Sequence, residues 1–254
     1  MPLPTSLNDH HGRILGPGDP FKFGCHPGVA CFTRCCRDAD MYLYPYDVIR
    51  MKRHLGMSSE DFLNTHTVVA IRDNPHFPHV MLKMSDAADR ACRFLSAHGC
   101  QIYPHRPYAC RAYPLERAVS RQARGPNRTA YYGIARHAYC QGHAEQTTWT
   151  ISDWSADQDL ADHEAMNDHW VDIDSLFRTN PWGEQGLRNP ALPMAFMACY
   201  NMDKFRQFVF ESSFLTRFAI PTPRIEAIRD TDEALMLLGF DWVRRILRNE
   251  GPLA

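Results

Sequence analysis

Residues 92–114 read CRFLSAHGCQIYPHRPYACRAYP, and this stretch decides how the rest of the chain is interpreted. Its three cysteines, Cys92, Cys100 and Cys110, are separated by spacers of seven and nine residues. Prolines and a glycine interrupt it, which favours short strands and loops over a long helix. Thiols grouped in this way are typical of a metal site or of redox chemistry.

Eight of the nine cysteines lie between residues 25 and 140, and only Cys199 lies outside. A chain of this length can bury its own core without disulfides, and residues 1–20 lack the charged start and apolar run of a secretory signal. We therefore expect a cytoplasmic protein in a reducing compartment, where clustered cysteines are more often metal ligands than disulfides. Redox chemistry and unrelated core thiols are the alternatives, and Cys199 is expected to be a core thiol. The candidate metal ligands are Cys25, Cys31, Cys35, Cys36, Cys92, Cys100, Cys110 and Cys140.

Composition identifies an ordinary globular protein: of 254 residues, 44% are apolar, 22% charged and 11% aromatic, which excludes a collagen, a disordered tail or a coiled-coil rod. A net charge of −1 gives no whole-molecule attraction for nucleic acid or an anionic membrane. The charge is divided, however. Residues 22–136 carry 17 Lys/Arg against 9 Asp/Glu, whereas residues 137–177 carry nine acids and no Lys or Arg. Either these segments pair or are solvated, or the basic excess surrounds an anionic thiolate centre.

The hydrophobic pattern predicts an α+β fold. We expect an N-terminal extension over 1–20, a loop-rich cysteine-cluster domain over 21–145, and a helical C-terminal region over 146–254 that packs on it and covers the site. Alternating apolar residues between turn signals predict short strands in the cysteine-cluster domain. These strands are expected at 41–44, 68–71, 80–84, 93–95 and 101–103.

Start and stop signals place the helices. Pro45 suits a first helical turn and Gly56 a helix end, which predicts a helix over 45–55, and Ser58 caps a shorter one over 60–65. In the C-terminal region, Thr231 is a good N-cap. Apolar stripes predict helices there at 159–177, at 193–208 with a break near Asn201, and at 231–248.

The cysteine spacing excludes the common signatures. The opening is C-x5-C-x3-C-C, and no C-x2-C occurs anywhere, which argues against zinc ribbons, treble clefs, thioredoxin-like sites and the bacterial ferredoxin run. Neighbouring side chains such as Cys35 and Cys36 point in different directions, so they serve two metals, or one cluster and a second site, more naturally than one ion. Eight thiolates could furnish two four-cysteine sites or one cluster plus reserve ligands.

The surroundings of the cysteines add two expectations. Several arginines, including the six named below, lie within four residues of a candidate ligand, and positive donors hold thiolates ionised. A general preference for arginine (24 Arg to 4 Lys) explains them equally well. Histidines near the cysteines are expected to be surface or supporting residues rather than ligands. The arginines are Arg34, Arg37, Arg90, Arg93, Arg106 and Arg111, and the histidines are His26, His98, His105 and His143.

Taken together, these residues resemble the YkgJ-type cysteine-cluster family, a zinc- or iron-chelating domain to which flagellin lysine N-methylase is similar. The resemblance covers about residues 21–143. It rests on the opening cysteines, on YPYDVIRMKRHLG at 44–56, on the block 92–114, and on Cys140 followed by Gln-Gly. The family usually opens with C-x2-C-x2-C-C, and this chain has longer spacers there. The resemblance implies a metal centre held by the eight cysteines, iron–sulfur rather than zinc.

Three functions stay open at this point. The first is an iron–sulfur protein with a structural or redox-active centre and a redox partner. The second, implied by the methylase relatives, is an S-adenosylmethionine-dependent protein lysine methyltransferase-like enzyme. The acidic stretch Asp153–Asp174 would then attract a basic protein substrate, although a solvated helix face explains it as well. The third is a non-catalytic zinc-binding module or a metal-trafficking protein. No catalytic residue is assigned.

Overall fold

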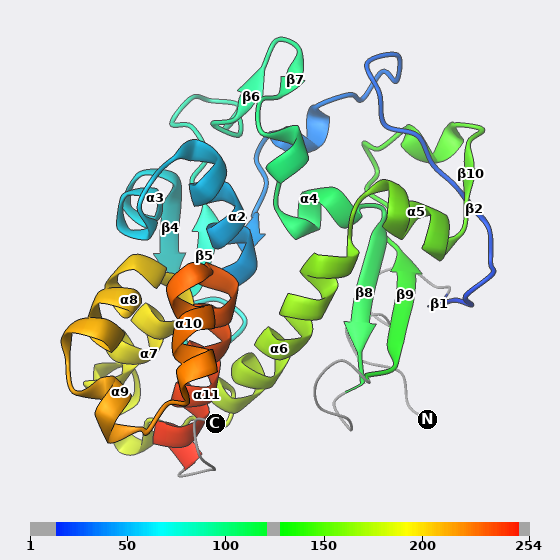
Figure 1. Cartoon of the computed structure of the whole chain (residues 1–254). Coiled ribbons are helices and arrows are strands. Elements are labelled where there is room, and N and C mark those ends of the chain that lie inside the picture. The colour runs from blue at the N-terminus through cyan, green and yellow to red at the C-terminus, as the bar shows by residue number, and fades with distance from the viewer. Residues whose placement is uncertain (1–13, 121–127, 249–254) are drawn as a thin grey trace. The chain divides into compact units, whose positions relative to one another are not determined.

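The computed structural model describes residues 14–120 and 128–248, which form two compact units (Figure 1). Unit 1 comprises Met1–Met41 and Met84–Asp168, and unit 2 comprises Tyr42–Lys83 and His169–Ala254. Short antiparallel strands lie mainly in the first half of the chain and helices mainly in the second, which confirms the α+β prediction. The three-part division along the chain stays a prediction, and residues 1–13 of its N-terminal extension lie outside the described residues. No helix in the described part of the chain is long and apolar enough to cross a membrane.

Three small antiparallel sheets support unit 1. They are β1 (Ile14–Leu15), β9 (Ala130–Ile134) and β8 (Leu115–Val119) in that order, β2 (Phe21–Lys22) with β10 (Thr148–Trp149), and β6 (Leu95–Ser96) with β7 (Gly99–Cys100). The sequence did not predict the β8–β9 pair. Leu, Glu, Arg and Ala in β8 are strong helix formers, so its strand conformation depends on pairing with β9.

An aromatic core holds the short helices of unit 1 to these sheets. Trp154 in α5 (Ile151–Asp157) is buried, and its indole Nε1 donates to the carbonyl oxygen of Ala112 at the end of α4 (Tyr108–Ala112), at 2.9 Å. Helix α6 (Ala161–Phe177) begins in unit 1 and continues into unit 2. The core residues are Leu15, Phe21, Phe23, Ala112, Leu115, Ile134, Trp154 and Leu160.

Unit 2 combines one three-stranded sheet with most of the helices. The sheet has the order β3 (Tyr42–Leu43), β5 (His79–Leu82), β4 (Thr67–Ala70), and both pairings are antiparallel. The helices are α2 (Pro45–Leu55), α3 (Ser59–His66), α7 (Ala191–Tyr200), α8 (Met202–Glu211), α9 (Phe214–Arg217), α10 (Thr222–Asp230) and α11 (Asp232–Arg248).

The predicted caps of the unit 2 helices are confirmed. Gly56 ends α2 with φ of 64°, a left-handed conformation that glycine adopts at little cost. Ser58 Oγ accepts a hydrogen bond from the Asp61 amide at 3.1 Å, and Thr231 Oγ1 accepts one from the Ala234 amide at 3.2 Å. The break near Asn201 also has a cause, because this residue caps the start of α8.

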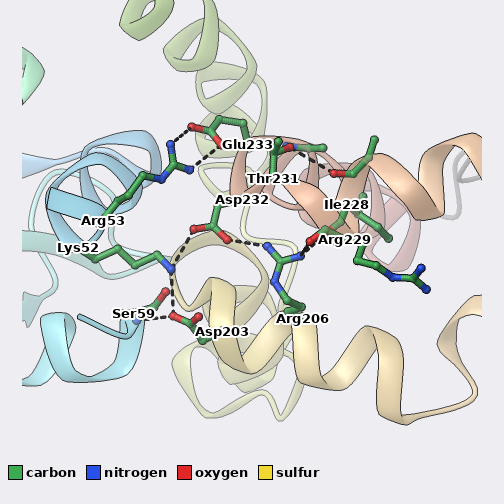
Figure 2. Close-up of polar contacts among 12 residues, drawn as sticks. Lys52, Arg53, Ser59, Asp203, Arg206, Ile228, Arg229, Thr231, Asp232 and Glu233 are labelled. Carbon is green, nitrogen blue, oxygen red and sulfur yellow. Dashed lines mark hydrogen bonds and ion pairs between the residues drawn. The ribbon is translucent and has the colours of Figure 1, made fainter. Parts of the chain in front are cut away.

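A buried ionic network joins α2 to the start of α11 (Figure 2). Lys52 Nζ lies 3.1 Å from Asp203 Oδ2 and 2.9 Å from Asp232 Oδ2, and its side chain is only 8% exposed. Arg206 contacts Asp232 at 2.6 Å from its other side. Beside this group, Arg53 makes a bidentate pair with Glu233 at 2.8 and 3.0 Å. Asp232 and Glu233 occupy the first turn of α11, where the helix dipole favours negative charge.

The strand predicted at 93–95 is displaced, because Arg93 and Phe94 lie in a turn and β6 begins at Leu95. Another predicted strand is wrong. Residues 101–103 form a turn that leads into a 3-10 helix, η2 (Tyr103–His105), and the preceding strand pair is β6 with β7. Pro104 explains the difference, because its fixed φ and missing N–H suit a first helical turn and cannot complete a strand ladder.

Candidate metal centre

All eight candidate ligands lie in unit 1, and every cysteine of the chain is a free thiol. Cys35 and Cys36 end the 3-10 helix η1 (Arg34–Cys36), Cys100 belongs to β7 and Cys110 to α4. The other four lie outside helices and strands: Cys31 in a turn, Cys92 at an isolated bridge, and Cys25 and Cys140 in irregular segments. Cys199 lies in α7 of unit 2 with an exposure of 0%, which confirms that it is a core thiol.

Two distant segments bring Cys25 close to Cys140. The amide of Gly24 donates to the carbonyl oxygen of Gly142 at 3.0 Å. This approach requires a glycine, because a Cβ at position 142 would lie 2.5 Å from the Gly24 oxygen. The glycine two residues after Cys140 therefore allows the two cysteine segments to meet.

Cys31 belongs to the same neighbourhood. The backbone amide of Gln141 donates a hydrogen bond to Cys31 Sγ at 3.1 Å. Cys25 is exposed at its surface, yet enough protein surrounds the thiol that burial raises its pKa, and the nearby thiols of Cys35, Cys31 and Cys140 add to the shift. Arg106 opposes these effects, and the resulting pKa is about 11. Such mutual repulsion is what closely spaced thiolates experience before a cation binds them.

A second neighbourhood contains Cys36, Cys92 and Cys100. The Cys92 amide donates to the carbonyl oxygen of Cys36 at 2.7 Å, and the Leu95 amide donates to the Cys92 carbonyl at 2.9 Å. Leu95 in turn faces Cys100 across the β6–β7 pair. Backbone bonds thus tie these three cysteines together, although 64 residues separate the first from the last.

Backbone amides also point at the sulfurs of this neighbourhood. The Phe94 amide hydrogen-bonds Cys92, and the Ile102 amide hydrogen-bonds Cys100; both lower the thiol pKa, although burial raises it more. Amide donors of this kind stabilise thiolates and tune a metal held by them.

Cys110 reaches the second neighbourhood from α4. Its Sγ lies 3.6 Å from Met41 Sδ, and its charge acts on Cys36. The adjacent Arg111 fixes this one-turn helix, because its Nη1 donates to the carbonyl oxygen of Gln158 at 2.5 Å.

The pKa values of the two adjacent cysteines are shifted in opposite directions. Cys35 and Cys36 share a hydrogen bond between their thiols, which lowers the pKa of Cys35 to about 7 and raises that of Cys36. Cys36 is raised further by burial and by the charges of Cys35, Cys110 and Cys92. The charge of Cys35 also acts on Cys25, so this pair lies where the two neighbourhoods meet.

The six nearby arginines do not act alike. Arg106 is buried; it donates to the Tyr103 carbonyl oxygen at 2.6 Å and to the side-chain oxygen of Gln158. Its charge lowers the pKa of both Cys25 and Cys100, against the larger effect of burial. Three others are engaged with carboxylates. These pairs are Arg37–Asp89 at 3.1 Å, Arg90–Asp38 at 3.3 Å and Arg93–Asp86 at 3.6 Å.

Two histidines near the cysteines have other partners. His26 Nε2 lies 3.3 Å from Glu145 Oε2, and His143 Nε2 lies 3.4 Å from the hydroxyl of Tyr113. Tyr113 also bonds Cys140; burial raises the pKa of its hydroxyl, and the Cys140 bond raises it further. Sequence reasoning gave Tyr113 no role, and its position three residues after Cys110 was the one available signal.

The donor set fits a thiophilic metal, because its members are thiols and amide donors already face several sulfurs. The thiols are neighbours without being in ligand geometry: within 14–120 and 128–248, no three or more His, Cys, Asp or Glu are arranged to hold a metal ion. The residues that would hold the metal are Cys25, Cys31, Cys35, Cys36, Cys92, Cys100, Cys110 and Cys140.

Comparison with protein families gives the class. Residues 24–148, which include all eight cysteines, match the CxxCxxCC family, described as a putative zinc- or iron-chelating domain. This part of the chain is a domain of the cysteine-cluster family, and the description of that family supports metal binding. Neither the curated proteins nor the solved structures gave a match.

Proposed function

We propose that this chain is a cytoplasmic iron–sulfur protein whose unit 1 cysteines ligate the cluster in a structural or redox role. The observation that carries the proposal is the convergence of eight thiols, from segments 25–36, 92–110 and 140, into two adjoining neighbourhoods of one unit. When bound, the cluster supplies iron that can change oxidation state. The chain's own residues ligate it, donate amide hydrogen bonds to its sulfur ligands and place Arg106 nearby.

The donor set favours iron–sulfur over zinc on two grounds. Zinc ribbons and treble clefs are built on C-x2-C knuckles, and this chain contains none. In addition, amides of Gln141, Phe94 and Ile102 donate to three different sulfurs, an arrangement by which proteins tune the potential of iron–sulfur clusters.

Anaerobic purification of the full chain tests the proposal. The expected product is brown, with broad absorbance near about 400 nm, bound iron and acid-labile sulfide, and an electron paramagnetic resonance signal after reduction or oxidation. Colourless protein that carries zinc and no sulfide, and that rejects reconstitution with iron and sulfide, would overturn it.

A matched pair of cysteine variants locates the metal. Cys110→Ala should lose metal and destabilise unit 1, because binding of a structural metal contributes folding free energy. Cys199→Ala should keep the metal, because this thiol is fully buried in the other unit. Equal metal loss in both variants would place the site elsewhere.

A further inference from the structure

We propose that the eight cysteines form two adjoining four-thiolate centres, with Cys25, Cys31, Cys35 and Cys140 in the first and Cys36, Cys92, Cys100 and Cys110 in the second. This inference rests on the proposed metal-binding function and adds the number of centres and the ligands of each. The chain passes from one centre to the other between Cys35 and Cys36.

Backbone pairing defines the first centre. The Gly24–Gly142 hydrogen bond brings Cys25 to the Cys140 segment, and the Gln141 amide joins Cys31 to it. The partners in these bonds all lie in 24–31 and 141–142, and none lies in the segment 92–110. These bonds therefore bring together the segments of Cys25, Cys31 and Cys140 without the segment 92–110.

A different set of bonds defines the second centre. Beyond the Cys92–Cys36 hydrogen bond, Arg37 forms an antiparallel bridge with Ala91, and the Asp38 amide donates to the Arg90 carbonyl oxygen at 3.1 Å. Residues 36–38 therefore run alongside residues 90–92. The 24–31 segment runs alongside 141–142 instead, so the chain changes partners within η1.

The helix η1 divides the adjacent cysteines between the centres. Successive side chains of a 3-10 helix diverge by about 120°, so two neighbours cannot both face one tetrahedral ion without distortion. Thr33, at the start of η1, has φ of 65°, and Arg37, at its end, is extended, so the chain reverses and straightens around this single turn. The first cysteine can serve the 25–31 side while the second serves the 92–110 side.

Titration of the reduced, metal-free full chain with Co²⁺ counts the centres directly. Thiolate-to-cobalt charge-transfer absorbance should saturate at two equivalents for the unaltered chain. Cys31→Ser and Cys100→Ser should each saturate at one equivalent with four-thiolate spectra, and the double variant should bind none. The Cys199→Ala control should keep two equivalents.

The outcomes separate this inference from the proposed function. Saturation of the unaltered chain at one equivalent, or loss of all cobalt from either single variant, would mean one shared centre and would overturn the inference while leaving a metal-binding protein. No cobalt, zinc or iron bound by the unaltered chain would overturn both. The number of cobalt equivalents bound by the unaltered chain tests the inference even if a variant fails to fold.

Discussion

Arg106 is the residue through which the protein's own charge acts on the thiols. Arg106→Gln should weaken metal binding by about 10–100-fold, the usual effect of losing a residue that supports metal ligands. Arg106→Lys keeps the charge without the guanidinium geometry and should recover part of the loss. Competition between the protein and a chromogenic chelator measures the affinity.

Arg90→Gln is the matched control for Arg106, because Arg90 is exposed and its charge faces Asp38. It should leave metal affinity within about twofold, since exposed ion pairs contribute little. If Arg106→Gln and Arg106→Lys were equally impaired, packing rather than charge would explain the role of Arg106.

His79 of β5 should make the folding stability depend on pH. Burial lowers the pKa of His79 below 6.5; Asp174 and Asp73 oppose this shift, and Arg178 adds to it. The unfolded chain therefore takes up this proton at a higher pH than the folded one. Stability should fall as the pH drops below about 6.5, and the loss should be complete below the lowered folded-state pKa.

Urea denaturation at pH 8 and pH 5 tests this contribution. Because other groups also titrate over this range, the comparison is between the unaltered chain and His79→Gln, which cannot be protonated. The variant should lose less stability between the two pH values. An identical loss in both proteins would show that His79 does not contribute.

At the scale of elements, the packing of α2 against α11 depends on the buried charge of Lys52. Lys52→Met should destabilise unit 2 by about 3 kcal/mol, because it leaves Asp232, whose side chain is 14% exposed, with one cationic partner instead of two. Denaturant unfolding measures the loss.

Lys204→Met is the control for Lys52, since Lys204 pairs with Glu60 and both side chains are about half exposed (52% and 46%). Its cost should stay below about 1 kcal/mol. A cost as large as that of Lys52→Met would mean that burial of the ionic network does not set its importance.

Elements with local signals were predictable from sequence, whereas elements that depend on pairing were not. Helices α2, α3 and α11 carry their own caps in Gly56, Ser58 and Thr231. Strand β8 carries no such signal, since its residues favour a helix until β9 lies beside them. The cysteine set followed from clustering along the chain, but its proposed division depends on backbone pairing between segments more than 50 residues apart, which no local pattern encodes.

At the scale of the whole molecule, the opposed charges of the sequence are partly neutralised within unit 1. Asp168, from the acidic segment, makes a bidentate pair with Arg117 at 2.6 and 2.9 Å. Glu164 accepts hydrogen bonds from the hydroxyls of Tyr108 and Tyr132, at 3.2 and 3.0 Å. These acidic residues are structural, so they are not available to attract a basic partner.

Metal removal should affect the two units differently. Unit 1 has small sheets and short helices, and its cysteine segments contribute few large core side chains, so the metal should supply much of its folding free energy. Unit 2 has no cysteine apart from Cys199 and should not respond. Hydrogen exchange before and after treatment with a strong chelator, without oxygen, should show lost protection in 84–120 and 128–168 but not in 169–248. An equal loss of protection in unit 1 and unit 2 would contradict this prediction.

The interruption of unit 1 by residues 42–83 also has a consequence for biosynthesis. A ribosome releases Cys25 to Cys36 first, then a stretch that belongs to unit 2, and only afterwards the remaining ligands. The second centre has its full ligand set once Cys110 has emerged, whereas the first must wait for Cys140. The second centre would thus bind its metal before the first, although the ribosome synthesises Cys25 of the first centre before any ligand of the second.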